Sequence, residues 1–478
     1  MRTTVTLSLI SHTNVGKTTL ARTLLRRDVG EVIDREHVTE RAESFTLIET
    51  ERAVLRLWDT PGFGNSANLL RLLRRHRSPI GWLLHQTWDR VVNRPLYCSQ
   101  QAAANVKQEA DVVLYLVNAA EDPTDAGYVT LELELLGWIG RPVVLLLNQI
   151  GTDGHALETR WRELARQSSV VRDVLSLDAF TRCWVEEEIL LRRVGRVLEG
   201  DKRPAMDELV RAWRERSLET FRASVARLAS YLVEAAGERE SEATGGGSSG
   251  LRSIAGALKF SAIDKRRAMR LLDERLDRAT ERLLDELIAA HGLEGASARR
   301  IERRVHDFEV RGDGIPIDER SGAVAGAVIS GALTGLAADA LSGGLTLGGG
   351  MIAGGILGAL GGAALGRGYR WAGGSDAPSV GWSSEFLARL TRQAVLRYLA
   401  VAHFGRGRGR FRDVEYPAHW SEAVDGALAP LRKRLDAVWE RARRPDADGA
   451  RVELTGLLGS AIESVLAAAY PAAERDRA

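Results

Sequence analysis

The sequence predicts an α/β fold over about the first 200 residues, with a doubly wound and mostly parallel sheet, followed by an all-α C-terminal region. Up to Leu198, short apolar runs alternate with amphipathic segments, which is the pattern of strand and helix in turn. Beyond Leu198 the chain is rich in Leu, Arg, Glu and Ala at helical spacing. With 478 residues and 45% hydrophobic content, it is long enough for two or three units.

Five short apolar runs are the candidate strands of the sheet. Polar or glycine-containing segments bound them, as is usual for buried strands of a parallel sheet. The runs cover residues 5–10, 54–58, 112–117, 143–147 and 173–175. We expect them to form one domain over residues 1–200, with helices on both faces of the sheet.

Composition divides the rest of the chain into three segments. Residues 201–320 have helical patterns over 205–236 and 251–291, separated over 238–250 by ERESEATGGGSSG, which is typical of a flexible linker. Residues 321–368 are rich in glycine and apolar residues. Residues 369–478 return to helical patterns, over 383–403, 417–443 and 452–473.

Charge and cysteine content argue against several classes of protein. The formal net charge is +2, so the overall charge does not favour nucleic acid as a partner. The two cysteines, Cys98 and Cys183, lie far apart without the spacing of a disulfide framework or a zinc site. The short apolar run at the start leads directly into a candidate binding loop, which is not the pattern of a cleavable signal sequence. We therefore expect a cytoplasmic protein.

The segment SHTNVGKT, residues 11–18, has the form of a phosphate-binding loop. In the pattern G-x-x-x-x-G-K-S/T, backbone N–H groups converge on the phosphates, the lysine reaches their oxygens and the hydroxyl binds Mg²⁺. Gly16, Lys17 and Thr18 match this pattern, and Ser11 stands where the first glycine is usual. The loop follows a predicted strand and opens a helix, whose N-terminus favours an anion. The sequence therefore predicts a P-loop NTPase fold.

The segment LRLWDTPGF, residues 55–63, supplies a second part of the site. Asp59 ends a predicted strand, where its carboxylate can hold the Mg²⁺ shell, and Gly62 can offer its N–H to the γ-phosphate. Thr39 lies between the two motifs and is a candidate switch threonine that closes over Mg²⁺. We expect Thr18, Thr39 and Asp59 to form the metal site, and Lys17 and Thr39 to act in catalysis.

The segment VVLLLNQIGTDG, residues 143–154, is the candidate base-reading segment. Asn148 stands where the asparagine of the guanine-reading motif N-K-x-D is expected, but Gln149 and Gly151 replace the lysine and the aspartate. That aspartate normally accepts both N–H protons of guanine, and Asp153 lies two residues too late to replace it directly. The sequence favours guanine but leaves the choice between GTP and ATP open.

Together these motifs resemble the TrmE/Era-like branch of the translation-factor class of GTPases over residues 1–198. They fit most closely a bacterial family in which such a domain precedes a helical domain of unknown function, through SHTNVGKT, GEVIDREHVT, LLNQIG and SLDAFTRCW. The resemblance implies a GTP/GDP site with Mg²⁺ that also includes Val15, Thr19 and Gln149. It further implies a second base-contacting loop at Ser176 and Leu177.

Two further expectations come from this resemblance. Asn14 matches an asparagine that is associated in some members with a K⁺ ion beside the phosphates. Phe63 stands where Ras-like enzymes carry the glutamine that positions water. The resemblance therefore implies a low intrinsic rate of GTP hydrolysis that depends on another group, such as a cation or the partner of a homodimer.

Residues 64–100 form a longer insert than such GTPases usually need between these motifs. The insert is helical in period and carries Trp82 and Trp88 among arginines. It is either an extra helical pair that caps the domain or an effector arm that the γ-phosphate moves.

The segment 321–368 predicts a helical hairpin at a membrane. Small residues recur in it at intervals of four, which places them on one helix face and permits close helix packing. Two helices over 322–338 and 344–366 would be about 25 and about 33 Å long, near the roughly 30 Å of the hydrocarbon layer. We expect peripheral or integral association with the cytoplasmic face of the inner membrane. A hairpin buried in a soluble fold stays open as the alternative.

The sequence thus predicts a GTP-binding protein and slow GTPase whose nucleotide state controls a membrane-associated helical module. A homodimer or a protein effector is expected as a partner, and nucleic acid is not. Two other functions stay open. The protein could be a non-enzymatic membrane or scaffold protein with a static or degenerate nucleotide site, or a P-loop enzyme that uses ATP.

Overall fold

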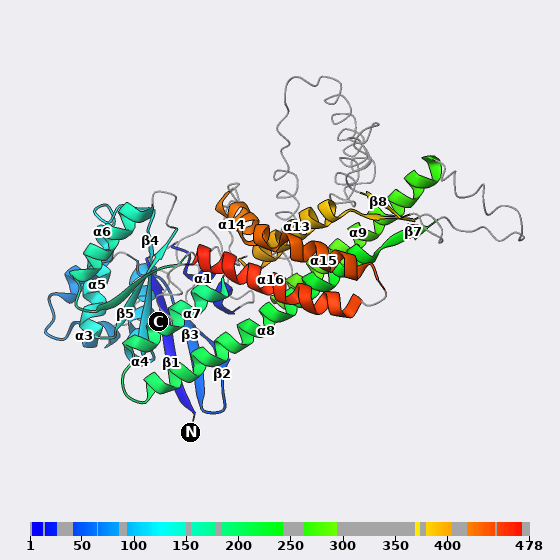
Figure 1. Ribbon diagram of the computed structural model, residues 1–478. Helices are drawn as coiled ribbons and strands as arrows, with labels where there is room; N and C mark the ends of the chain where they lie inside the picture. Colours follow the sequence, from blue (N-terminus) through cyan, green and yellow to red (C-terminus); the bar gives the residue numbers. More distant parts are fainter. Residues whose placement is uncertain are drawn as a thin grey trace, which may run out of the picture. The chain divides into compact units, whose positions relative to one another are not determined.

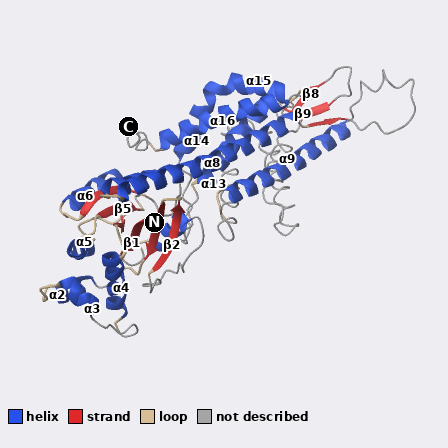
Figure 2. Cartoon of the chain, turned by 90° about the horizontal axis from the view of Figure 1, so that it is seen from below, coloured by secondary structure: helices blue, strands red, loops and turns tan. Residues whose placement is uncertain are grey.

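The chain forms two compact units. The first comprises Met1–Glu219, Ala402–Asp413 and Tyr470–Ala478, and the second comprises Thr220–Val401 and Val414–Ala469. The computed structural model (Figures 1 and 2) describes residues 2–12, 15–25, 42–64, 66–85, 93–149, 154–177, 183–241, 262–293, 369–372, 379–403, 418–444 and 447–470.

A six-stranded sheet forms the centre of the first unit, in the order β2-β3-β1-β4-β5-β6. All neighbouring strands are parallel except β2, which runs antiparallel to β3. The strands are β1 (Thr3–Ser11), β2 (Glu43–Glu49), β3 (Ala53–Asp59), β4 (Val112–Asn118), β5 (Val143–Asn148) and β6 (Val171–Ser176). The predicted doubly wound sheet is confirmed, and the five predicted strands are present.

Strand β2 is the one strand of this sheet that the sequence analysis did not include. It lies at the sheet edge, and only Leu47 and Ile48 are buried. The pairing with β3 shifts register between Thr46 and Ile48, which interrupts the alternation of buried and exposed residues. An edge strand of this kind has no apolar run that sets it apart from a loop.

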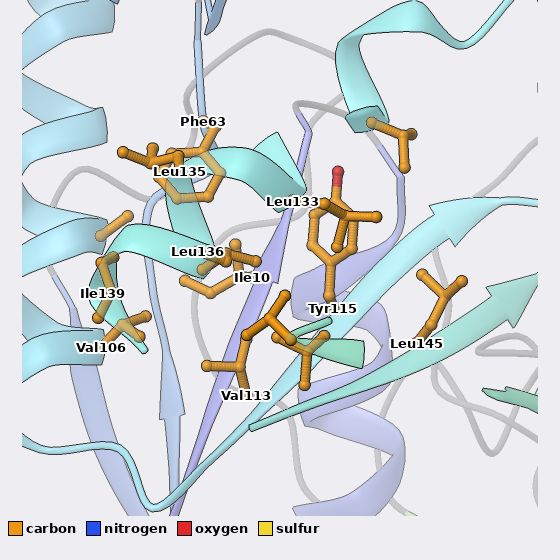
Figure 3. Close-up of a cluster of buried hydrophobic side chains, with 14 of the residues drawn as sticks. Ile10, Phe63, Val106, Val113, Tyr115, Leu133, Leu135, Leu136, Ile139 and Leu145 are labelled. Atoms are coloured by element: carbon orange, nitrogen blue, oxygen red, sulfur yellow. The ribbon is translucent and has the colours of Figure 1, made fainter. Parts of the chain in front are cut away.

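Helices cover both faces of the sheet, with α4, α5 and α6 on one face and α1 and α7 on the other (Figure 1). Strand residues such as Ile10, Val113 and Tyr115 form one apolar cluster with the side chains of α4, α5 and α6 (Figure 3). The helices of this unit are α1 (Lys17–Leu25), α2 (Ser66–Leu73), α3 (Pro79–His85), α4 (Arg94–Gln108), α5 (Gly127–Ile139), α6 (Gly154–Arg166) and α7 (Trp184–Val197).

The predicted insert contains α2 and α3. Their buried side chains Leu69, Leu73, Ile80 and Leu83 belong to the apolar cluster of the first unit, and both helices contact α5. Trp82 stacks on His76 with ring centroids 4.2 Å apart. The two helices therefore extend the core, in agreement with an extra helical pair, and their movement as an effector arm stays a prediction.

The second unit consists mainly of helices, together with a small antiparallel sheet in the order β7-β9-β8. The chain passes from the first unit to the second within α8. The elements are α8 (Lys202–Gly237), β7 (Arg239–Ser241), α9 (Ala262–Ala290), β8 (Tyr369–Ala372), β9 (Ser379–Trp382), α13 (Ser384–Ala402), α14 (Ala418–Leu428), the 3₁₀ helix η2 (Ala429–Leu431), α15 (Arg432–Ala442) and α16 (Ala447–Ala469).

Two details differ from the sequence-based expectations for this unit. The first residues of the segment expected as a linker form β7, which pairs with β9, and residues 242–250 of that segment lie outside the described part. The helix expected over 417–443 is interrupted by η2. Pro430 lies in this turn and has no N–H for a helical hydrogen bond, which explains the interruption.

Helix α16 has the length and composition of a membrane-spanning helix. Among the described residues, it alone is long and apolar enough to cross a membrane by length and composition, and 39% of its apolar window is buried. Its buried side chains recur at intervals of three and four, and it contacts α14 and α15. This is the pattern of a helix that packs one face into a core. The glycine-rich segment 321–368 lies outside the described residues.

Both cysteines are buried. Cys98 lies within α4, and Cys183 precedes α7. Burial, followed by the negative charge of Glu186, raises the pKa of the Cys183 thiol well above its usual value.

We expect the stability of the second unit to depend on Asp277, which lies on α9. Burial raises the pKa of Asp277 to about 6, and Glu281 adds to the rise while Arg397 opposes it. Since this value lies above that of an unfolded aspartate, the stability contributed by Asp277 falls as the pH rises from about 4 to about 6. The wild type should lose roughly 1–2 kcal/mol more over this interval than Asp277→Asn, after allowance for partial exposure.

Urea unfolding at pH 4.5 and pH 7.5 measures this difference. Asp285→Asn, at an exposed carboxylate of the same helix, is the control and should behave as the wild type. An equal loss in the wild type and in Asp277→Asn would contradict the prediction.

Candidate functional site

The candidate phosphate loop connects β1 to α1 in the first unit. Gly16 has φ = 96°, a left-handed conformation that glycine adopts without strain, and Lys17 begins α1. Ser11 is the last residue of β1 and pairs with Leu116 of β4. Among the described residues, Gln149 is the one non-glycine with positive φ, so Ser11 needs no glycine-like backbone. The serine at the first glycine position is therefore compatible with the loop.

Lys17, Thr18 and Asp59 meet at the start of α1. The Thr18 hydroxyl donates a hydrogen bond to Oδ2 of Asp59 (2.9 Å), and Nζ of Lys17 lies 3.4 Å from Oδ1. Both Lys17 and Asp59 are buried, and Oδ1 accepts no hydrogen bond from any described residue. A cation, a hydroxyl and a carboxylate with a spare oxygen form a suitable set for phosphate and a divalent metal.

Contacts with β1 hold the D-T-P-G segment in place. Asp59 pairs with Leu9 in the parallel register of β1 and β3, and the Thr60 hydroxyl donates to the carbonyl of Leu9 (2.6 Å). The N–H of Phe63 donates to the carbonyl of Ser11 (3.0 Å). The segment that contains Gly62 is thereby fixed beside the phosphate loop, as the sequence predicts.

Asn148 contacts the phosphate loop directly. It is fully buried at the end of β5, and its Nδ2 donates to the carbonyl of Val15 (2.8 Å). Gln149 follows with φ = 60°, so the chain turns sharply after Asn148. The expected base-reading residue therefore also holds the loop, a role that the sequence analysis did not assign to it.

The expected second base-contacting loop begins next to this residue. Ser176 pairs with Leu147 of β5, and the N–H of Leu177 donates to the carbonyl of Leu147 (3.0 Å). The Ser176 hydroxyl is buried and has no hydrogen-bond partner among the described residues. Ser176 and Leu177 thus lie at the same edge of the sheet as Asn148.

Phe63, which follows the D-T-P-G segment, has an apolar environment. Its side chain is fully buried and lies in the apolar cluster near Leu135 of α5 (Figure 3). The Phe63 side chain therefore belongs to the hydrophobic core of the first unit.

Some predicted site residues cannot be placed. Asn14, Thr39, Gly151 and Asp153 lie outside the described part of the chain. The residues that are brought together around the loop are Ser11, Val15, Gly16, Lys17, Thr18, Thr19, Asp59, Gly62, Asn148, Gln149, Ser176 and Leu177.

A buried polar cluster behind the loop was missed by the sequence analysis. Glu132 on α5 is fully buried and accepts hydrogen bonds from His12 Nδ1 (2.6 Å), the Ser66 hydroxyl (2.6 Å) and the Tyr115 hydroxyl (2.7 Å). These four residues are called the Glu132 cluster below. Burial, followed by the charge of Glu132, raises the pKa of Tyr115 well above its usual value, so Tyr115 remains a donor. The sequence offered one sign of this cluster, because Glu132 stands between two leucines in a largely apolar helix.

Two family models match the chain. Residues 6–149 match the family described as 50S ribosome-binding GTPase, and residues 164–455 match the domain of unknown function DUF3482. The second match covers more than half of the chain. No curated protein matches the chain.

Solved structures of GTPases are similar to part of the chain. An Era variant from Aquifex aeolicus bound to GDP and AlF4⁻ has 19% identity and a TM-score of 0.30, with 42% of this chain and 58% of that chain covered. Era with MgGDPNP and 16S ribosomal RNA has 17% identity and a TM-score of 0.31, with 42% and 59% covered. NFeoB from S. thermophilus bound to mGMPPNP has 18% identity and a TM-score of 0.25, with 48% and 71% covered.

The chain thus spans less than two thirds of the length of the two Era chains. The family matches agree with the domain order that the motifs predict, in which a GTPase domain precedes a helical domain of unknown function. With a P-loop GTPase domain at its amino-terminal end, the chain belongs to the family of proteins that carry DUF3482.

Proposed function

We propose that the first unit binds GTP and GDP with Mg²⁺ and hydrolyses GTP slowly. The observation that carries this proposal is the meeting of Lys17, Thr18 and Asp59 beside the left-handed Gly16. The match of residues 6–149 to a GTPase family supports guanine as the base. The burial of Phe63 supports a low intrinsic rate, because the residue that follows D-T-P-G is unable to position water.

Each residue of the site has its own role in binding the nucleotide. Lys17 neutralises the β- and γ-phosphates, and the N–H groups at the start of α1 face the same anion. Thr18 and Asp59, with Thr39, would hold Mg²⁺, which neutralises the charge of the phosphates when bound. The described residues fit this role, since none of them donates a hydrogen bond to the buried Oδ1 of Asp59 and the Thr18 hydroxyl donates to Oδ2. Asn148 reads the base and keeps the loop in shape through Val15.

We further propose that the nucleotide state controls the helical region that follows. The glycine-rich segment 321–368 supports association of this region with the cytoplasmic face of the inner membrane, since its small residues recur at helical spacing. A K⁺ ion at Asn14 and either a homodimer or a protein effector as partner complete the proposal, together with the domain boundaries expected from the sequence. The K⁺ ion depends on the resemblance of the motifs, and the boundaries depend on the changes in composition along the chain.

Removing the charge of Asp59 should weaken the dependence of GTP binding on Mg²⁺. Asp59→Asn keeps an oxygen for the Thr18 hydroxyl but lacks the negative charge that attracts the metal. We expect the gain in affinity for GDPNP on adding Mg²⁺ to fall by about tenfold, the effect of one lost charged contact. Titration of GDPNP in the presence of Mg²⁺ and in the presence of EDTA measures this gain in affinity.

Asp173→Asn is the control, at a β6 carboxylate paired with Arg193, and it should show the wild-type gain. A wild-type gain in Asp59→Asn would contradict the proposed role of Asp59.

Calorimetric titration of the full chain with GTP, GDP and ATP tests the proposed function. The titration is carried out with Mg²⁺ in either K⁺ or Na⁺ buffer. Selective binding of guanine nucleotides supports the proposal, and tighter binding in K⁺ than in Na⁺ supports the ion at Asn14. Preference for ATP would show that the loss of the aspartate at Gly151 changed the specificity. Absence of binding by the folded protein would favour a static scaffold.

A further inference from the structure

The Glu132 cluster joins four parts of the first unit, which are the phosphate loop, α2, β4 and α5. Oε1 of Glu132 accepts the bonds from both His12 and Ser66, and Oε2 accepts the bond from Tyr115 of β4. A carboxylate with no exposed surface is tolerated only where such donors replace its lost hydration. Because one oxygen accepts two of the bonds, a shift of either donor changes the bond to the other.

The two donors to Oε1 come from two different elements, the phosphate loop and α2. His12 is the second residue of the phosphate loop, and its ring also packs against Tyr128 of α5, with centroids 4.3 Å apart and an interplanar angle of 30°. Ser66 is the first residue of α2 and is itself buried. It follows Gly62, the expected partner of the γ-phosphate, by four residues.

Three of the residues that follow Gly62 form hydrogen bonds with other parts of the first unit. Phe63 is attached to β1 through the carbonyl of Ser11, and the N–H of Gly64 donates to the hydroxyl of Ser99 on α4 (3.2 Å). Ser66 is then attached to Glu132. Since Ser66 follows Gly62 by only four residues, a rearrangement at Gly62 acts close to the start of α2.

We propose that Glu132 is a positioning residue that couples the phosphate loop to α2, through His12 and Ser66, and thereby favours the triphosphate-bound form. The inference rests on the proposed function, since it concerns the response of the same site to the γ-phosphate. When Gly62 contacts that phosphate, the positions of the phosphate loop and of the start of α2 depend on each other, because His12 and Ser66 donate to the same oxygen of Glu132. Neutralising Glu132 weakens both bonds and separates the two elements.

The test compares the affinities of the full chain for GDP and for the non-hydrolysable analogue GDPNP. Glu132→Gln has nearly the same shape but lacks the charge and one of the two acceptor oxygens. Its ratio of GDPNP to GDP affinity should fall about tenfold from that of the wild type, the effect of one charge-assisted hydrogen bond. Ser8→Ala is the matched control, because it removes another buried hydrogen bond of this unit, from Ser8 to Asn105 (2.7 Å). Its ratio should stay within about twofold of the wild type.

Two single variants keep the inference testable if Glu132→Gln does not fold. Ser66→Ala and His12→Phe each remove one donor, and the phenylalanine keeps a ring that can pack against Tyr128. Each should lower the ratio, and the double variant should lower it by less than the product of the two effects, because both act through Glu132. Independent effects in this cycle would overturn the coupling.

The outcomes separate the inference from the proposed function. If the wild type binds both nucleotides but folded Glu132→Gln keeps the wild-type ratio, the coupling is wrong and the nucleotide site stands. An equal fall in Ser8→Ala would likewise overturn the coupling, since the effect would then be one of stability. If the wild type binds neither nucleotide, both the function and the inference fail.

Discussion

Replacement of Lys17 with alanine should lower the affinity for GTP and GDP by about 100-fold or more. Lys17 Nζ is buried 3.4 Å from Oδ1 of Asp59, so its loss removes the buried cation that is proposed to neutralise the phosphates. Truncating one member of a buried charged contact typically has an effect of this size or larger. Calorimetric titration with both nucleotides measures the loss.

The fold must be shown to survive this change. Circular dichroism and thermal unfolding report on it, and Lys107→Ala, at an exposed lysine of α4, is the matched control. The control should bind nucleotide as the wild type does. If folded Lys17→Ala also kept wild-type affinity, residues 11–18 would not be the phosphate-binding loop.

Introduction of the Ras-like glutamine at Phe63 should destabilise the protein without accelerating GTP hydrolysis. The side chain at this position lies in the apolar cluster with Leu135 and is fully buried. Phe63→Gln would bury an amide without partners and leave part of the ring volume empty, at a cost of about 2–4 kcal/mol in the free energy of unfolding. Urea unfolding and a phosphate-release assay measure the two effects.

Phe63→Leu is the control for this prediction. It keeps an apolar side chain in the cluster, so its loss of stability should be smaller than that of Phe63→Gln, about 1–2 kcal/mol. Its turnover should equal that of the wild type. Faster hydrolysis in Phe63→Gln with unchanged stability would show that the side chain reaches the phosphates after all.

Local sequence patterns were enough to predict the core of the fold and most of the site. The parallel strands β4 and β5 are continuous apolar runs, and the phosphate loop is defined by the consecutive residues Gly16, Lys17 and Thr18. Asp59 was predicted beside them because the ends of parallel strands meet at one edge of the sheet. Each of these inferences needs only neighbouring residues and a topology rule.

The polar contacts between distant residues could not be predicted in the same way. Asn148 and Val15 are 133 positions apart, and His12 and Glu132 are 120 apart. A hydrogen bond between such distant residues leaves no periodic pattern in the sequence. The hydrophobic pattern of each helix or strand reflects only which of its residues are buried. The sheet β7-β9-β8 was missed for another reason, since strands of three or four residues are too short to show alternation.

The burial of both native thiols has a practical consequence for following α2 in solution. Thiol reagents attack the exposed thiolate, and Cys98 and Cys183 are both inaccessible in the folded chain. A cysteine introduced at the exposed Arg71 of α2 would therefore be the preferred site for a maleimide fluorophore or spin label, with no need to remove the native pair. A single substitution is therefore enough to label α2 and to observe it by spectroscopy during nucleotide exchange.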